Sequence, residues 1–148
     1  MARTLRHQAL IDAPVGDVWE IVSDPRTHPE WWPDVVRIDA PDGLVEGDEY
    51  VHSGKMMPFI DAVDAIWVVE RLEHLRECQF RCTMTGTYAR FQLTPAQDDT
   101  YVELEVGMDP TSWQWKLAAP MFGLQFKRWL LAVLDALPDA VESRHAPA

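Results

Sequence analysis

The sequence lacks several patterns that would each place it in a well-defined functional class. It has no run of about 18 or more consecutive apolar residues, so no transmembrane helix is expected. It has no cluster of Lys and Arg, and its formal net charge is −11, which disfavours binding to nucleic acid and to anionic membranes. Its histidines show neither HxH nor HExxH spacing, and no phosphate-binding glycine loop or GxSxG motif occurs. We therefore expect no metal, no cofactor, no nucleic acid partner and no stable membrane insertion.

The chain is also poor in cysteine. Cys78 and Cys82 lie in one predicted strand, which separates their Cα atoms by about 13 Å at ~3.3 Å per residue. A disulfide needs a Cα separation of roughly 4.4–6.8 Å, so no bridge between them is expected. The first residues, Met1 to His7, lack the apolar stretch of a signal peptide, and we expect a cytoplasmic protein.

Tryptophan, in contrast, is abundant. Seven Trp residues occur among 148, and side chains of this size either fill a thick core or line a site for a large apolar partner. The length suits a single domain, residues 1–148, whose core is large enough to be stable without disulfides or metals.

Apolar periodicity predicts the element order: a strand, two short helices, six strands and a long helix. Alternation predicts strands over 4–12, 35–40, 48–53, 61–73, 77–85, 87–94 and 100–108. Helical spacing predicts short helices over 14–23 and 27–32, the second opened by a capping box from Thr27 to Glu30. A turn over 112–117 precedes a long helix over 120–137, whose polar residues Gln125, Lys127, Arg128 and Asp135 are expected to face outward.

Short connections between the strands indicate an antiparallel sheet, and hence an α+β domain. One long helix cannot cover six or seven strands, so the remaining concave apolar face must be filled by side chains or by a ligand. The strict alternation over 100–108 predicts that Leu104 and its apolar neighbours face the long helix. The same alternation predicts that Glu103 and Glu105 face water.

The segment IDAPVGDVWEIVSDPRTHPEWWPDV contains Ile11-Asp12-Ala13-Pro14-Val15, Val18-Trp19, Asp24 and Trp31-Trp32-Pro33. It resembles the signature of the START-like helix-grip superfamily, with its polyketide cyclase/dehydrase branch the nearest fit, and the element order matches along almost the whole chain. The resemblance implies a seven-stranded antiparallel sheet curved around the C-terminal helix, enclosing a deep cavity for a hydrophobic small molecule.

Within that branch, aromatase/cyclases carry a Ser-Trp-x-Ser-Glu-Arg motif whose arginine lies in the cavity. The corresponding stretch here, residues 66–71, keeps Trp67, Glu70 and Arg71 and lacks both serines. Alternation from Trp67 through Val69 also places Arg71 on the apolar face of its strand, where a guanidinium could hold an enol or carboxylate oxygen. The alternative is an Arg71 at the strand end, paired with Glu70 or Glu73.

Tyr50 and His52 share a face of another strand. A histidine can carry a proton near neutral pH and a phenol can donate a hydrogen bond, so both join Arg71 as catalytic candidates. The alternative for His52 is a satisfied or exposed strand residue without a catalytic role.

Apolar side chains on the predicted inner faces and in two apolar loops are candidates for binding the ligand. Cys78, Phe80, Cys82 and Met84 form one soft face, better suited to a cavity wall or core than to nucleophilic chemistry. The loops 56–60 and 113–115 could form an adaptable lip, or pack on each other or on a partner in a homodimer. The ligand-binding candidates are Trp31, Trp32, Met57, Phe59, Trp67, Val69, Phe80, Cys82, Met84, Phe91, Trp113, Phe122 and Phe126.

The sequence therefore favours a protein that binds a lipid, polyketide or other polycyclic molecule in an internal cavity as a carrier or sensor. The first alternative is an aromatase/cyclase or dehydratase reaction in the same cavity. The second is a protein-interaction module that uses the patch over residues 56–60.

Overall fold

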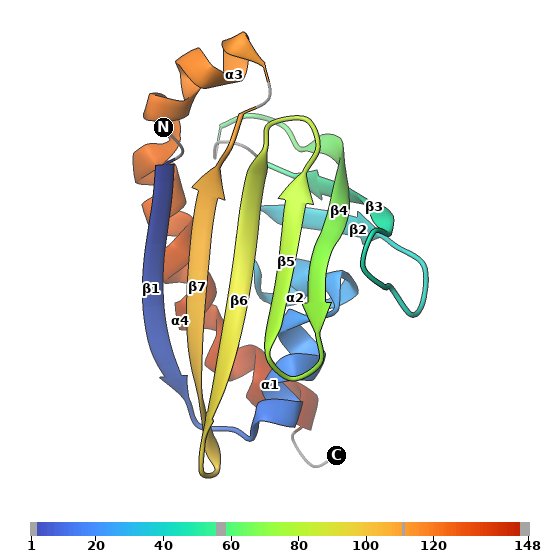
Figure 1. The fold of residues 1–148 in the computed structure, drawn as a ribbon, viewed down its shortest axis with the longest axis vertical. Coiled ribbons are helices and arrows are strands. Elements are labelled where there is room, and N and C mark those ends of the chain that lie inside the picture. The colour runs from blue at the N-terminus through green and yellow to red at the C-terminus, as the bar shows by residue number, and fades with distance from the viewer. Residues whose placement is uncertain (1–2, 56–58, 111, 146–148) are drawn as a thin grey trace.

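A computed structural model describes residues 3–55, 59–110 and 112–145. One seven-stranded antiparallel sheet forms a single layer, and the long C-terminal helix runs behind it (Figure 1). The elements are β1 (Arg3–Ile11), α1 (Val15–Val22), the 3₁₀ turn η1 (Pro25–Thr27), α2 (His28–Trp31), β2 (Val35–Asp39), β3 (Glu49–Gly54), β4 (Val63–Glu73), β5 (Glu77–Cys82), β6 (Thr87–Ala96), β7 (Asp99–Met108), α3 (Trp113–Ala118), the 3₁₀ turn η2 (Ala119–Phe122) and α4 (Gly123–His145). The predicted fold class is confirmed.

The strands are ordered β1-β7-β6-β5-β4-β3-β2, so all neighbours except β1 and β7 are consecutive in the chain. Antiparallel hairpins join these consecutive strands, as the short predicted connections required. The β5–β6 turn depends on Gly86, which has a φ of +76° and whose added Cβ would lie 2.0 Å from the carbonyl oxygen of Asp109.

The start of α2 differs from the predicted capping box. Thr27 is the last residue of η1 and has helical backbone angles, and its side chain makes no hydrogen bond that caps α2. Its hydroxyl instead lies 2.7 Å from the carbonyl oxygen of Ile21 and accepts a hydrogen bond from Nε1 of Trp31 at 3.1 Å. The 3₁₀ turn has removed the extended conformation that an N-cap residue needs.

The long helix is both later and longer than predicted. It begins at Gly123, after η2, and continues through Pro138 to His145. Leu137 and Val141, on either side of Pro138, are both buried in the core. Their burial supports the helix beyond the point where the missing N–H of proline would otherwise favour its end.

Half of the concave face is closed by aromatic side chains, and we call this cluster the filled half: His28, Trp31, Trp32, Phe80 and Phe91. His28 makes edge-to-face contacts with Trp31 and Phe80, with ring centroids 5.4 and 5.3 Å apart. All five side chains are buried. The short helix α2 therefore covers this part of the concave face, as α4 covers the part formed by β1 and β7.

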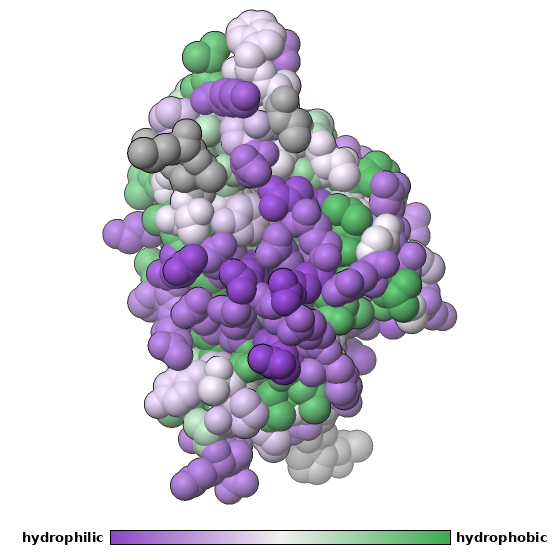
Figure 2. Space-filling model, viewed as in Figure 1, coloured by the Kyte–Doolittle hydropathy of each residue, from purple (hydrophilic) through white to green (hydrophobic). Residues whose placement is uncertain are grey.

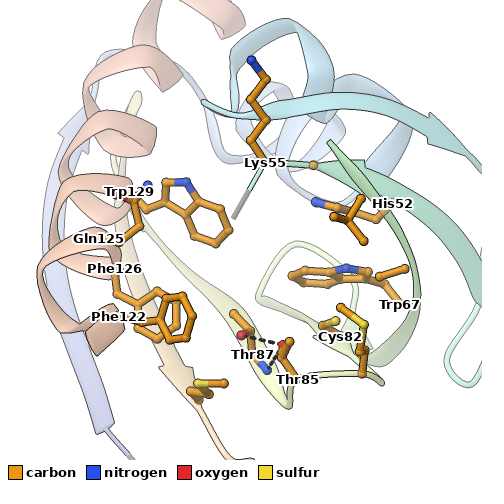
Figure 3. Close-up of a pocket in the computed structure, with 15 residues that line it drawn as sticks. His52, Lys55, Trp67, Cys82, Thr85, Thr87, Phe122, Gln125, Phe126 and Trp129 are labelled. Carbon is orange, nitrogen blue, oxygen red and sulfur yellow. Dashed lines mark hydrogen bonds between the residues drawn. The ribbon is translucent and has the colours of Figure 1, made fainter. Parts of the chain in front are cut away.

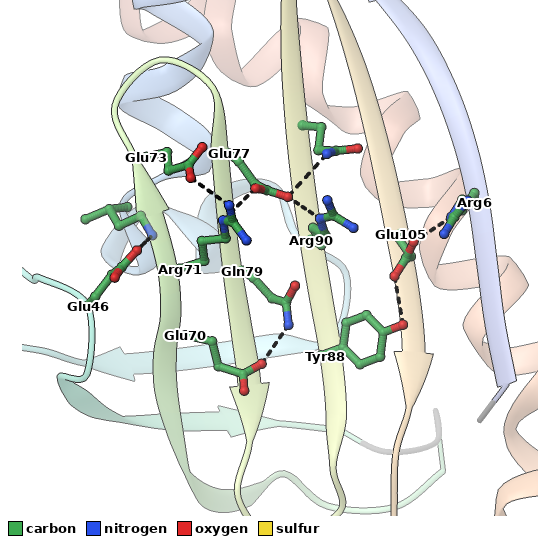
Figure 4. Close-up of polar contacts among 12 residues, drawn as sticks. Arg6, Glu46, Glu70, Arg71, Glu73, Glu77, Gln79, Tyr88, Arg90 and Glu105 are labelled. Carbon is green, nitrogen blue, oxygen red and sulfur yellow. Dashed lines mark hydrogen bonds and ion pairs between the residues drawn. The ribbon is translucent and has the colours of Figure 1, made fainter. Parts of the chain in front are cut away.

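The convex face of the sheet is polar. Figure 2 shows hydrophilic residues gathered across its centre, over the strands that Figure 1 draws in front. The prediction that Glu105 faces water is wrong, because its side chain is buried on this face. Arg6 and the hydroxyl of Tyr88 donate hydrogen bonds to it, the latter at 2.8 Å (Figure 4). Glu103 is half-buried, and the apolar residues of β7 face inward as predicted.

Candidate ligand-binding site

A pocket of about 60 Å³ lies between the concave face and the beginning of α4. Strands β3, β4 and β5 form one side, and η2 with the first turns of α4 forms the other (Figure 3). The lining residues are His52, Gly54, Lys55, Val63, Ala65, Trp67, Cys82, Met84, Thr85, Thr87, Met108, Phe122, Gln125, Phe126 and Trp129. Since a single water needs a cavity of roughly 10–15 Å³, a volume of about 60 Å³ has room for a small molecule.

Aromatic rings form two opposite walls of the pocket. On the sheet side, His52 stacks on Trp67 with ring centroids 4.4 Å apart and planes inclined by 20°. On the helix side, Phe126 lies between Phe122 and Trp129, with centroid distances of 6.1 and 6.2 Å. The indole Nε1 of Trp129 donates a hydrogen bond of 3.1 Å to Asp34, which fixes that ring.

His52 is a neutral imidazole in this environment. Its side chain is buried, and burial lowers its pKa from 6.5 to about 4. Nδ1 is buried and has no hydrogen-bond partner among the described residues. At neutral pH the ring is therefore an uncharged group that can offer one donor and one acceptor.

Few other polar groups reach the pocket. The hydroxyl of Thr85 donates a hydrogen bond of 2.8 Å to that of Thr87. Gln125 also lines the pocket, so the prediction that it faces outward is wrong. It lies three residues after Phe122 and four before Trp129, and this helical spacing places all three on one face.

The prediction that Arg71 shares the inner face with Trp67 and Val69 is wrong. The pairing of β4 with β5 shifts register between Val69 and Arg71, so Glu70 is an extra residue in a β-bulge. Beyond the bulge the alternation restarts, and Arg71 lies opposite Gln79 on the convex face.

There the guanidinium of Arg71 is about half exposed and donates to Glu73 at 2.6 Å and to Glu77 at 2.7 Å (Figure 4). This agrees with the strand-end ion pair considered from the sequence, with Glu73 as one partner. Arg71 is therefore not placed to touch a molecule in the pocket. Tyr50, the other catalytic candidate, is buried beside the filled half, 6.3 Å from Phe80, and does not line the pocket.

The ligand-binding candidates fall into four groups. Those that line the pocket are Trp67, Cys82, Met84, Phe122 and Phe126. Those buried in the core away from it are Trp31, Trp32, Val69, Phe80 and Phe91. Phe59 and Trp113 are exposed at the surface, and Met57 lies outside the described residues.

Sequence reasoning missed part of the lining. The lining residues that were not candidates are Gly54, Lys55, Val63, Ala65, Thr85, Thr87, Met108, Gln125 and Trp129. Strand alternation already placed Val63 and Ala65 with Trp67, and helical spacing placed Trp129 with Phe126, whereas Gln125 was expected to face outward. No sequence signal marked Thr85 and Thr87, which flank the β5–β6 turn.

The described residues contain no group of three or more His, Cys, Asp or Glu side chains that could hold a metal ion. Cys78 and Cys82 are free and buried, and burial raises the pKa of the Cys78 thiol. No helix in the described part of the chain is long and apolar enough to cross a membrane.

A family model described as polyketide cyclase / dehydrase and lipid transport matches residues 2–142. No curated protein matches the sequence significantly. Among solved structures, the chain is similar to the Zhui aromatase/cyclase from Streptomyces sp. R1128, at a TM-score of 0.77 and 15% identity, covering 97% of this chain and 96% of that one.

A START superfamily protein from Mycobacterium smegmatis is similar at a TM-score of 0.76 and 16% identity, covering 95% of this chain and 98% of that one. The norcoclaurine synthase of Thalictrum flavum, solved as a point mutant with a transition-state analogue, has a TM-score of 0.69 at 14% identity and covers 99% and 98%. At these identities the structural likeness shows the fold alone.

Proposed function

The chain belongs to the polyketide cyclase / dehydrase and lipid transport family, and from this premise we propose that it binds a hydrophobic small molecule in the pocket between β3–β5 and α4 without converting it. The observation that carries the proposal is the pair of aromatic walls. Trp67, stacked on His52, lines one side of the pocket, and Phe126 and Trp129 line the other. Apolar walls with a few polar groups are what small-molecule sites generally have.

A carrier or sensor role is favoured over catalysis by what the pocket lacks. Among the described residues, no Asp or Glu lines it, and Arg71 lies on the opposite face of the sheet. General acid–base chemistry usually pairs groups of different pKa. Here such chemistry would depend on His52, which is essentially unprotonated at neutral pH.

The second candidate function is a cyclase or dehydratase reaction in the same pocket. His52 is the observation that favours it, because a neutral imidazole can accept a proton from a substrate carbon or hydroxyl. The two functions separate on turnover: a carrier returns its ligand unchanged, whereas an enzyme releases a cyclised or dehydrated product.

Filling the pocket tests the proposed function. Ala65 lines it on β4, whereas its neighbour Ile66 is exposed and faces away from it. We expect N-phenyl-1-naphthylamine, a neutral fluorescent dye, to bind the wild-type protein. Ala65→Phe should weaken this binding at least about tenfold, which corresponds to ~1.4 kcal/mol.

Ile66→Phe is the matched control, since it adds the same ring on the other side of the strand, and it should leave dye binding unchanged. Absence of dye binding to the wild-type protein up to the solubility limit would refute the proposed function. Equal loss in both variants would place the dye elsewhere. Native mass spectrometry of gently purified protein would then identify any natural ligand that is carried along.

A further inference from the structure

The ring nitrogens of His52 differ in what surrounds them. Nδ1 is buried and has no partner among the described residues. Nε2 is the nitrogen nearest Gly54, another lining residue, because a Cβ added there would lie 2.9 Å from it. Figure 3 shows a ring nitrogen of His52 pointing toward the open space of the pocket.

This asymmetry determines which nitrogen carries the proton. The neutral imidazole has one N–H and one bare nitrogen. A proton on Nδ1 would be a buried donor with no acceptor among the described residues, and orphaned buried N–H groups are rare in proteins. A proton on Nε2 can be satisfied by an acceptor on a molecule that occupies the pocket. His52 therefore offers the pocket an N–H donor.

Thr87 adds a second donor of the same kind. Its oxygen accepts the hydrogen bond from Thr85, and its own hydroxyl proton has no acceptor among the described residues. Lys55 is the charged residue of the described lining, and Figure 3 shows its ammonium group pointing away from the aromatic walls. The pocket thus presents uncharged donors and no inward-facing charge.

The pocket also restricts the shape of what it can hold. The space is small, and the rings on both sides are held in place, His52 by stacking on Trp67 and Trp129 by its hydrogen bond to Asp34. Fixed aromatic walls favour an aromatic ring, which packs against them by offset or edge-to-face contacts. A fatty acid fits poorly for a second reason, because its carboxylate would find no cation directed into the pocket.

On the basis of the proposed function, we propose that the ligand is a neutral, flat aromatic compound bearing a carbonyl oxygen, and that Nε2–H of His52 donates a hydrogen bond to this oxygen. Gly54 is the residue that makes this possible, since a larger side chain there would displace Nε2. The proposal selects aromatic ketones over acyl-chain lipids and assigns His52 a role in specificity.

The test compares two probes of nearly the same shape, 1-indanone and indane, which differ by one carbonyl group. Isothermal titration calorimetry should show that the wild-type protein binds 1-indanone about three- to tenfold more tightly, the range expected for one net hydrogen bond. His52→Phe keeps a stacking ring and should bring this ratio close to one. Gly54→Ala keeps the histidine and should also lower the ratio.

His7→Phe is the matched control, because His7 is an exposed strand residue outside the pocket lining, and it should leave the ratio unchanged. Nitrogen-15 spectra of the His52 ring give an independent measurement in the unaltered protein. We expect the Nε2–H tautomer, with its Nε2 signal shifting when 1-indanone is added.

Each outcome bears on the inference. Equal affinity for the two probes, a ratio that survives His52→Phe, or an Nδ1–H tautomer would overturn it while leaving the proposed function standing. Binding of decanoic acid more tightly than 1-indanone would favour the lipid class instead. If neither bicyclic probe nor the dye binds, the proposed function itself fails.

Discussion

The filled half and the pocket are built from the same kinds of side chain on the same face of one sheet, yet one is solid and the other hollow. Each contains a buried histidine against tryptophan: His28 beside Trp31 and Trp32, and His52 stacked on Trp67. The difference is the element above them. Around α2, Trp31 and Trp32 pack against Phe91 of β6, and His28 packs against Phe80 of β5. The beginning of α4 instead leaves a gap over β3 and β4. Aromatic content alone therefore does not mark a binding site.

The largest expected difference between the filled half and the pocket is in the cost of removing one buried side chain. Phe91 is fully buried, and Phe91→Ala should lower the free energy of unfolding by about 3–5 kcal/mol, because the well-packed surroundings cannot collapse into the cavity. Met84 lies at the pocket and is partly exposed, so Met84→Ala should cost less than about 1 kcal/mol. Urea unfolding monitored by circular dichroism measures both. Similar losses would mean that the pocket is as tightly packed as the core.

The two histidines provide a second comparison, through pH. Burial lowers the pKa of His28 to about 3 and that of His52 to about 4, both from 6.5. Below pH 6.5 the unfolded chain therefore binds protons that the folded chain does not, and stability falls as the pH falls. Each histidine should contribute a slope of about 1.4 kcal/mol per pH unit between pH 6.5 and its own folded pKa.

His28→Phe and His52→Phe should each remove one such contribution, as measured by urea unfolding at pH 6.5 and pH 5. In a nuclear magnetic resonance titration of the folded protein, His52 should protonate before His28, since only His52 adjoins an open space. A slope unchanged in both variants, or a His28 that titrates near neutral pH, would contradict the burial of these rings.

The smallest expected effect is a difference between the tryptophans of the pocket and those of the filled half in their response to a ligand. Titration with 1-indanone, followed by the nitrogen-15 signals of the indole N–H groups, should shift the signals of Trp67 and Trp129, which line the pocket. The signals of Trp31 and Trp32 should move much less, because these side chains lie in the filled half. Larger shifts at Trp31 and Trp32 would show that the filled half opens for the ligand.

The architecture could be predicted from the sequence because it depends on periodicity. Strict alternation in β7 and the apolar face of α4 follow from simple rules of spacing, and both are confirmed. The position of Gln125 could also have been predicted, had its spacing been weighed above its polarity. The prediction for Arg71 failed because it assumed that the alternation of β4 continues without interruption past Glu70.

Two features of the structure were beyond such rules. Trp31 and Trp32 belong to the core because of where α2 docks, and a local pattern does not encode docking. Glu105 is buried on a face that alternation assigns to water because Arg6 and Tyr88 cover it from the neighbouring strands. Both outcomes depend on contacts between residues that are distant in the sequence.

The bulge at Glu70 reverses which residues of β4, odd-numbered or even-numbered, lie on each face of the sheet. Up to Val69, odd-numbered residues lie on the concave face of the sheet, and from Arg71 onward odd-numbered residues lie on the convex face. Aligning this strand with that of a relative can therefore match a residue's identity and still assign it to the wrong side of the sheet. The same geometry means that a regular strand of the same length would turn Arg71 inward, whereas deleting the extra residue Glu70 would leave Arg71 on the convex face. The bulge itself therefore separates a neutral interior from a cationic one.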